Sequence, residues 1–267
     1  MTTLDKQFKE QENVKRTGKV TIKQRISEVV KSQAKKYSII RPSLYELSSI
    51  SKIIECNEET LLRFIDPNFD NDNPLFRNEF NLLKLELDNR RSRIINDLIY
   101  PDEWKVGTRS SYILYYLVRL RKPKIFVETG VANGVSSYFI LNAMKYNNIG
   151  KLVSIDINKN VGVLLNENEK ERWELFLLGR NSMKAFIERI DGLRMDMFMH
   201  DSNHRYKWQM FEYSNILKRL EGDFIFLSDD IDSSYAFMDF CKLNRFNPLI
   251  LIDEKKLFGL LYPKFGF

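Results

Sequence analysis

Histidine and cysteine are scarce in this chain of 267 residues, which has two of each. Cys56 and Cys241 lie far apart and match no spacing typical of a zinc site. We therefore expect reduced, buried thiols in a cytoplasmic protein. Both histidines, His200 and His204, fall within the single stretch MFMHDSNHRY, on either side of Asp201. This stretch is the one place where imidazole chemistry can be sought.

Long apolar runs are also missing. No run approaches the roughly 20 apolar residues that span a bilayer. The first residues, MTTLDKQFKEQENVKRTGK, have no apolar core of the kind found in a secretory signal. No period of about 20–50 residues recurs, which excludes a repeat protein. Hydrophobic residues make up 43% of the chain, so we expect a substantial folded core and no membrane span.

Charge is unevenly distributed. Residues 1–40 hold 10 Lys and Arg against 4 Asp and Glu, which accounts for the whole net charge of +6. A basic arm of this kind can bind nucleic acid, but a solvated leader is more common. The neutral remainder has no basic run that would line a nucleic-acid groove. We therefore expect a solvated leader and no nucleic-acid partner.

Hydrophobic periodicity divides the chain near residue 105. Residues 1–104 predict a basic, helical leader, with helices at 21–37, 43–54, 57–65 and 79–100. Beyond it, apolar strands at 124–130, 151–157, 174–179, 195–201 and 222–230 alternate with helices at 109–122, 136–147, 166–175, 182–190, 205–220 and 233–245. Two final strands, 248–253 and 257–263, form an antiparallel pair. This order predicts an α/β, Rossmann-like, doubly wound and mostly parallel seven-stranded sheet over residues 105–267.

Ligands in such sheets bind beyond the carboxyl ends of the strands. After the first predicted strand comes VETGVANGVSS, in which Gly130 and Gly134 allow a tight turn before a helix near Ser136. Position 132 is alanine, so this is not a complete dinucleotide fingerprint, and no P-loop lysine follows. Glu128 is expected to point a carboxylate into the same crevice. A purely structural turn is the alternative.

Asp156 ends the second strand, roughly 20 residues beyond the glycine loop. An acid in that position accepts both ribose hydroxyls of a bound nucleoside. An isolated aspartate could instead cap a helix. The two signals together favour a nucleoside site.

Three further carboxylates follow the fourth and fifth strands: Asp201, then Asp229 and Asp230. Packed carboxylates repel one another unless a cation is present, and oxygen ligands suit Mg²⁺. The alternative is that Asp229 or Asp232 only caps the following helix.

The two histidines do not form a zinc pair, because that spacing requires a helix and this segment is a strand tip followed by a turn. His200 is expected to pack within the strand. His204 lies where a general base would face a substrate. A hydrogen bond within the loop is the alternative role for His204.

Taken in order, these residues resemble the class I S-adenosylmethionine-dependent methyltransferases. The similarity rests on ETGVANG, Asp156, Asp201, Asp229–Asp230 and the terminal strand pair, and covers about residues 105–267. The metal-dependent O-methyltransferases are the most similar branch. DSNHRY resembles the D-G-D-H-S-Y signature of relatives that act on sugars and other small hydroxylated compounds.

The resemblance implies roles for individual residues. Glu128, Gly130 and Gly134 would line the methionine part of the cofactor, Asp156 would hold the ribose, and Asn181 and Ser182 would lie near the adenine. Ala132, Ser136, Ile157 and Asp201 complete the predicted cofactor site. Asp201, Asp229 and Asp230 would ligate Mg²⁺, and Asp201 would also take part in catalysis. His204 occupies the offset of the lysine base of catechol-type relatives, whereas Asn203 stands where some sugar-modifying relatives have an aspartate base.

The sequence therefore predicts a Mg²⁺-dependent O-methyltransferase for a small hydroxylated acceptor, such as a sugar of a glycan or natural product. One alternative is a nucleic-acid methyltransferase that uses the basic arm. Its Asn/Asp-Pro-Pro-Tyr/Phe motif is absent, because the Asn-Pro pairs at 73–74 and 247–248 are each followed by leucine. The other alternative is a non-catalytic cofactor-binding or assembly protein. A homo-oligomer is compatible with all three of these hypotheses.

Overall fold

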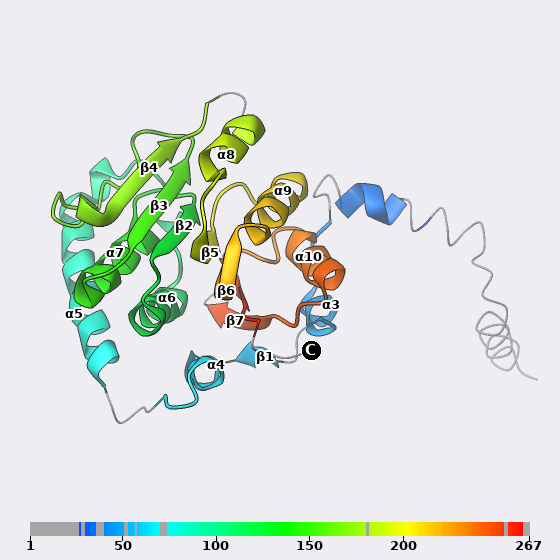
Figure 1. Ribbon diagram of the computed structural model, residues 1–267, viewed down its shortest axis with the longest axis horizontal. Helices are drawn as coiled ribbons and strands as arrows, with labels where there is room; N and C mark the ends of the chain where they lie inside the picture. The colour runs from blue at the N-terminus through cyan, green and yellow to red at the C-terminus, as the bar shows by residue number, and fades with distance from the viewer. Residues whose placement is uncertain are drawn as a thin grey trace, which may run out of the picture.

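The fold is an eight-stranded sheet with helices on both faces, seen in a computed structural model (Figure 1). The structure describes residues 27, 30–35, 40–50, 53–56, 58–69, 74–179, 182–253 and 256–263. The strand order is β1-β7-β8-β6-β5-β2-β3-β4, and β8 runs antiparallel to β6 and β7 while the other pairs are parallel. The strands are β1 Ile53–Cys56, β2 Ile125–Thr129, β3 Lys151–Asp156, β4 Trp173–Leu177, β5 Met195–His200, β6 Leu220–Ser228, β7 Leu249–Asp253 and β8 Lys256–Leu261.

The predicted fold class is confirmed. All seven expected strands are present, and the last two form the expected antiparallel pair. Strand β1 is one more strand, at the edge of the sheet. The described helices longer than one turn are α3 Leu44–Ser48, α4 Glu58–Ile65, α5 Leu75–Arg93, α6 Thr108–Arg121, α7 Val135–Asn147, α8 Ser182–Ile190, α9 Tyr206–Leu217 and α10 Ala236–Asn244. Residues 30–35 are helical as well, while most of the predicted helix 21–37 lies outside the described residues.

Alternation along the strands places successive side chains on opposite faces of the sheet. Phe126 of β2 packs with buried residues of α4 to α7, whereas its neighbour Val127 packs with those of α8 to α10. Leu152 and Val153 of β3 divide in the same way. Both faces are thus apolar, which explains why the central strands are nearly continuous hydrophobic runs.

The leader departs from the predicted helical pattern at residues 43–54. Only α3 is helical there, started by a capping box in which Ser43 and Glu46 bond each other's backbone amides. The chain then forms β1, which pairs with β7 in the register Ile53↔Leu249. A serine-rich stretch followed by β-branched isoleucines favours this change from helix to strand. The boundary at residue 105 stays a prediction, although leader segments join both the sheet and the core.

The polar helix predicted at 166–175 is also wrong. This segment contains only a short 3₁₀ turn, Lys170–Arg172, before β4 begins at Trp173. Glu169 accepts a hydrogen bond from the Asn166 amide at 2.7 Å and pairs with Arg90 of α5. These contacts hold the loop against α5, so tertiary pairing overrides the helix-forming composition.

The two cysteines and the described helices were also the subject of predictions. Cys241 is a free, buried thiol, as predicted, and the side chain of Cys56 lies outside the described residues. Among the helices that the structure describes, none has the length and apolar character needed to cross a membrane.

Gly259 of β8 provides a test of packing in the sheet. A Cβ atom at this position would lie 2.5 Å from the ring of Phe237, which is buried in α10. Gly259→Ala should therefore overpack the core and lower the free energy of unfolding by about 1–3 kcal/mol, measured by denaturant unfolding. Gly179→Ala is the control, because a Cβ atom there meets nothing within 4 Å. Equal stability of the two variants would contradict the packing of α10 on β8.

Candidate active site

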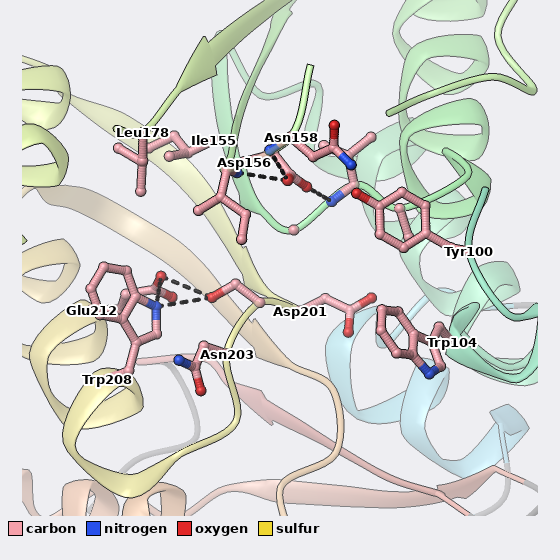
Figure 2. Close-up of a pocket in the computed structure, with 15 residues that line it drawn as sticks. Tyr100, Trp104, Ile155, Asp156, Asn158, Leu178, Asp201, Asn203, Trp208 and Glu212 are labelled. Carbon is pink, nitrogen blue, oxygen red and sulfur yellow. Dashed lines mark hydrogen bonds between the residues drawn. The ribbon is translucent and has the colours of Figure 1, made fainter. Parts of the chain in front are cut away.

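A cavity of about 640 Å³ lies at the carboxyl ends of the central strands (Figure 2). Its walls come from the β2–α7 loop, the ends of β3 and β4, the β5–α9 segment and the leader loop before α6. Ligands of doubly wound folds bind at this edge of the sheet. The predicted site residues that line the cavity are Gly130, Ala132, Asp156, Ile157 and Asp201.

The β2–α7 loop touches the end of β5, and Gly130 makes this contact possible. Its φ of 82° lies in the left-handed region that favours glycine. A Cβ atom here would lie 1.9 Å from the carbonyl oxygen of Asp201. The amide of Asp201 in turn donates to the Thr129 carbonyl at 2.8 Å. Gly130 and Ala132 thereby line the cavity, whereas Gly134 lies behind them at the start of α7.

Glu128 differs from the expectation that it points into the crevice. Its side chain is fully buried, and its carboxylate accepts hydrogen bonds from the hydroxyls of Ser136, Ser137 and Ser154 at 2.5, 2.6 and 2.8 Å. Burial raises the pKa of Glu128, while the three hydroxyls oppose that shift. Glu128 and Ser136 therefore join β2, β3 and α7 beneath the glycine loop and do not line the cavity.

Asp156 lines the cavity and also connects its loops. One carboxylate oxygen accepts from the Val131 amide at 2.9 Å, and the other from the amides of Ile157 and Asn158 at 2.6 and 2.9 Å (Figure 2). An ionised carboxylate has about four acceptor sites, so it can accept a further hydroxyl. The structure thus leaves room for the ribose contact predicted for Asp156.

Glu212 of α9 forms a buried polar network under the cavity. Its carboxylate accepts hydrogen bonds from Thr129, Ser202 and Trp208 at 2.9, 2.9 and 2.5 Å. Nδ1 of His200 lies 2.6 Å from the same carboxylate, and the His200 side chain is buried as expected. The network holds the β5–α9 segment in a fixed position relative to β2, since it joins residues of both.

An acidic cluster extends from the cavity to the ends of β5 and β6. We use this name for Asp201, Asp229 and Asp230 together with His204 and Lys256. Nδ1 of His204 lies 3.3 Å from Asp230 Oδ2, and its Nε2 lies 3.6 Å from Asp201 Oδ1. Lys256 Nζ lies 3.1 Å from Asp229 Oδ2 and 3.6 Å from Asp230 Oδ2. The three carboxylates predicted to converge are thus brought together.

Burial shifts the proton affinities in the acidic cluster. Burial and the charge of Asp229 raise the pKa of Asp201 well above its usual range. Burial raises the pKa of Asp229 to about 6, with Lys256 acting in the opposite direction. Burial also lowers the pKa of His204 to about 3, helped by the nearby His200 and Lys256. His204 is therefore neutral at pH 7.

The acidic cluster does not match a metal centre in its present arrangement. Three carboxylates have the chemistry that Mg²⁺ prefers. Within the ranges that the structure describes, however, no group of three or more His, Cys, Asp and Glu side chains is placed to hold a metal ion. Lys256 already contacts two of the three predicted ligands. The Mg²⁺ site therefore stays a prediction.

Comparisons with known proteins agree with this geometry. A family model described as a methyltransferase domain matches residues 127–231, the segment from β2 to the end of β6. Residues 127–231 form a methyltransferase domain. This match confirms, over these residues, the predicted resemblance to methyltransferases. No curated protein matches the sequence.

Solved structures share the fold of this chain. An O-methyltransferase of Streptomyces achromogenes involved in tomaymycin synthesis, solved with S-adenosylmethionine, is 16% identical over 66% of this chain and 88% of its own, with a TM-score of 0.50. A Podospora anserina methyltransferase with S-adenosylhomocysteine is 15% identical, covering 79% and 99%, with a TM-score of 0.51. A Bacillus cereus O-methyltransferase with S-adenosylhomocysteine is 13% identical, covering 76% and 96%, with a TM-score of 0.50.

Some residues that line the cavity were not revealed by the sequence patterns. Tyr100 and Trp104 reach the cavity from the leader, opposite Trp208 of α9 (Figure 2). The Tyr100 amide and carbonyl bond the side chain of Asn133 at 3.3 and 2.9 Å, which ties the leader to the glycine loop. Burial raises the pKa of Tyr100, and the charge of Asp156 adds to the shift. The aromatic residues on either side of Pro101 are the sequence feature that could have indicated a contribution of the leader to the cavity.

The segment after β4 was predicted to lie near the adenine. Asn181 lies outside the described residues, and Ser182 begins α8 with its side chain outside them. Leu178, just after β4, lines this side of the cavity. The roles predicted for Asn181 and Ser182 stay predictions.

Asp156 gives the most direct test of the cofactor site. Asp156→Ala removes a charged acceptor from the cavity wall, and hydrogen bonds to charged groups contribute about 1.5–3 kcal/mol. We expect at least a ~10-fold loss of affinity for S-adenosylhomocysteine by calorimetry. Glu167→Ala, at a side chain that is 90% exposed, should leave the affinity unchanged. Unaltered binding by Asp156→Ala would remove Asp156 from the cofactor site.

Proposed function

We propose that the protein transfers the methyl group of S-adenosylmethionine to a hydroxyl of a small acceptor. The observation that carries this proposal is the connection of the cavity to the acidic cluster through Asp201, which belongs to both. A nucleoside-type site and a site for proton removal are thus neighbours. The solved structures of O-methyltransferases that share the fold support the same reaction class.

The residues of the cavity fit the cofactor. Asp156 has acceptor capacity for the ribose, and Gly130 allows close approach of a ligand to the backbone. Apolar and aromatic side chains, among them Leu178 and Trp208, form the remaining walls. When bound, S-adenosylmethionine would supply an electrophilic methyl group on its sulfonium.

His204 is the residue that we assign to proton removal from the acceptor. Its Nδ1 faces Asp230, which orients the ring and selects the tautomer that carries a proton on Nδ1. Its Nε2 is buried and has no hydrogen-bond partner among the described residues. The unprotonated Nε2 is thereby available to accept the proton of an acceptor hydroxyl. The acceptor oxygen would then take the methyl group as its bond to sulfur breaks, with S-adenosylhomocysteine as the leaving group and positioning contributing much of the acceleration.

The acceptor class rests on the sequence resemblance. DSNHRY favours small hydroxylated compounds, and we propose a sugar of a glycan or natural product as the first class to test. Mg²⁺ dependence stays a prediction. The proposed reaction does not require a metal ion, because Lys256 already contacts Asp229 and Asp230, two of the predicted ligands. Neither the nucleic-acid alternative nor the assembly-protein alternative gains support from the comparisons.

The proposed reaction is tested by transfer of a radiolabelled methyl group. The purified protein would be incubated with labelled S-adenosylmethionine and a panel of free sugars, nucleotide-linked sugars and catechols. Labelled O-methyl product from at least one hydroxylated compound is expected. Failure to bind S-adenosylhomocysteine at concentrations near ~1 mM would overturn the proposal, since such weak binding is worth less than about 4 kcal/mol.

His204→Ala tests the assignment of the base. General base catalysis contributes roughly 10²–10⁴-fold, so we expect kcat to fall by about 100-fold or more. The affinity for S-adenosylhomocysteine should change less than about twofold, because His204 does not line the cavity. Arg205→Ala, at the exposed neighbouring side chain, is the control. A variant with unchanged kcat would show that His204 only hydrogen-bonds within its loop.

A further inference from the structure

Lys256 occupies a position in the acidic cluster that the proposed reaction does not explain. It is the first residue of β8, and its side chain is 22% exposed. Its ammonium lies 3.1 Å from Asp229 Oδ2, where it donates a hydrogen bond, and 3.6 Å from Asp230 Oδ2. Lys256 therefore places a positive charge at the ends of β5 and β6.

The charge balance of the cluster depends on this lysine. Asp229 is 1% exposed, and buried carboxylates that lie together are unfavourable without a cation. A divalent ion is one way to meet that requirement, and an ammonium group is another. Lys256 meets it from within the chain, so the carboxylates are partly neutralised before any ion binds.

The position of the ammonium conflicts with metal coordination by the same oxygens. Mg²⁺ lies about 2.0–2.1 Å from its oxygen ligands and demands near-octahedral geometry. Lys256 Nζ contacts one oxygen each of Asp229 and Asp230, so an ion on those oxygens would sit beside a second positive charge. A metal ion could bind these two oxygens only after the ammonium moved away.

The backbone limits such a movement. Lys256 pairs with Asp253 in the β7–β8 ladder, and β8 lies between β6 and β7 in the sheet. Its Cα position is thereby set by the pairing with β7, while β6 holds β8 from Gly259 onward. Only the side chain can swing, and doing so would deprive the buried Asp229 carboxylate of its ammonium partner.

We propose that Lys256 is the resident cation of the acidic cluster and competes with divalent metal ions for Asp229 and Asp230. It replaces the Mg²⁺ predicted from the sequence and keeps a positive charge beside the acceptor end of the site. Methyl transfer should then proceed without a divalent ion. This last consequence rests on the proposed function, whereas the competition does not.

The competition is tested by Mn²⁺ binding, followed by the electron paramagnetic resonance signal of free Mn²⁺. Wild-type protein is expected to bind Mn²⁺ weakly, and Lys256→Gln at least ~10-fold more tightly, because the variant retains the carboxylates without their cation. Lys84→Gln is the matched control: it removes a lysine from the surface pair with Asp88, 2.6 Å away, and should bind like wild type. If Lys256→Gln does not fold, Lys256→Met serves the same comparison.

One result would overturn the inference: a folded Lys256→Gln variant that binds Mn²⁺ no more tightly than wild type. Equal affinities would show that the Lys256 ammonium does not exclude the ion. This result would leave the binding of S-adenosylhomocysteine unaffected. Conversely, failure of methyl transfer with every acceptor would sink the proposed function and leave the Mn²⁺ comparison standing.

Discussion

The contact between Gly130 and the backbone of Asp201 is the constraint on which the active site depends. Strands β2 and β5 are direct neighbours in the centre of the sheet, in the register Thr129↔His200. Their ends can meet only because position 130 has no side chain. This contact places the glycine loop, which borders the cavity, next to Asp201 of the acidic cluster. The proposed cofactor site and the proposed site of proton removal are therefore adjacent at this contact.

Buried carboxylates hold this junction from below. Glu128 gathers three serine hydroxyls on one side of β2, and Glu212 gathers Thr129, Ser202 and Trp208 on the other. Each carboxylate accepts at least three hydrogen bonds, and buried charge is tolerated when it is hydrogen-bonded in this way. Glu128 lies outside the cavity, whereas Glu212 also lines it. The leader adds Tyr100 and Trp104 from outside, so the cavity is shared between the sheet and the segment before α6.

The sequence predicted the parts of this structure that depend on local periodicity. Seven strands, the glycine loop and the aspartates after β3, β5 and β6 could be found because apolar runs and strand ends are visible in the chain. Lys256 and Tyr100 could not, since their importance comes from contacts with residues far away in the sequence. The position of Glu128 at the end of a strand could be predicted. Its burial among Ser136, Ser137 and Ser154 could not, because Ser154 comes from another strand. The 166–175 loop was mistaken for a helix because its pairing with Arg90 is equally distant.

The central claim is that the cavity beside Asp201 is the cofactor site of a methyltransferase. A crystal structure of the protein with S-adenosylhomocysteine tests it most directly. The account predicts that the ribose hydroxyls lie within hydrogen-bond distance of Asp156, about 2.7–3.2 Å, and that the sulfur faces Asp201 and His204. A ligand bound outside this cavity, or with its ribose away from Asp156, would contradict it.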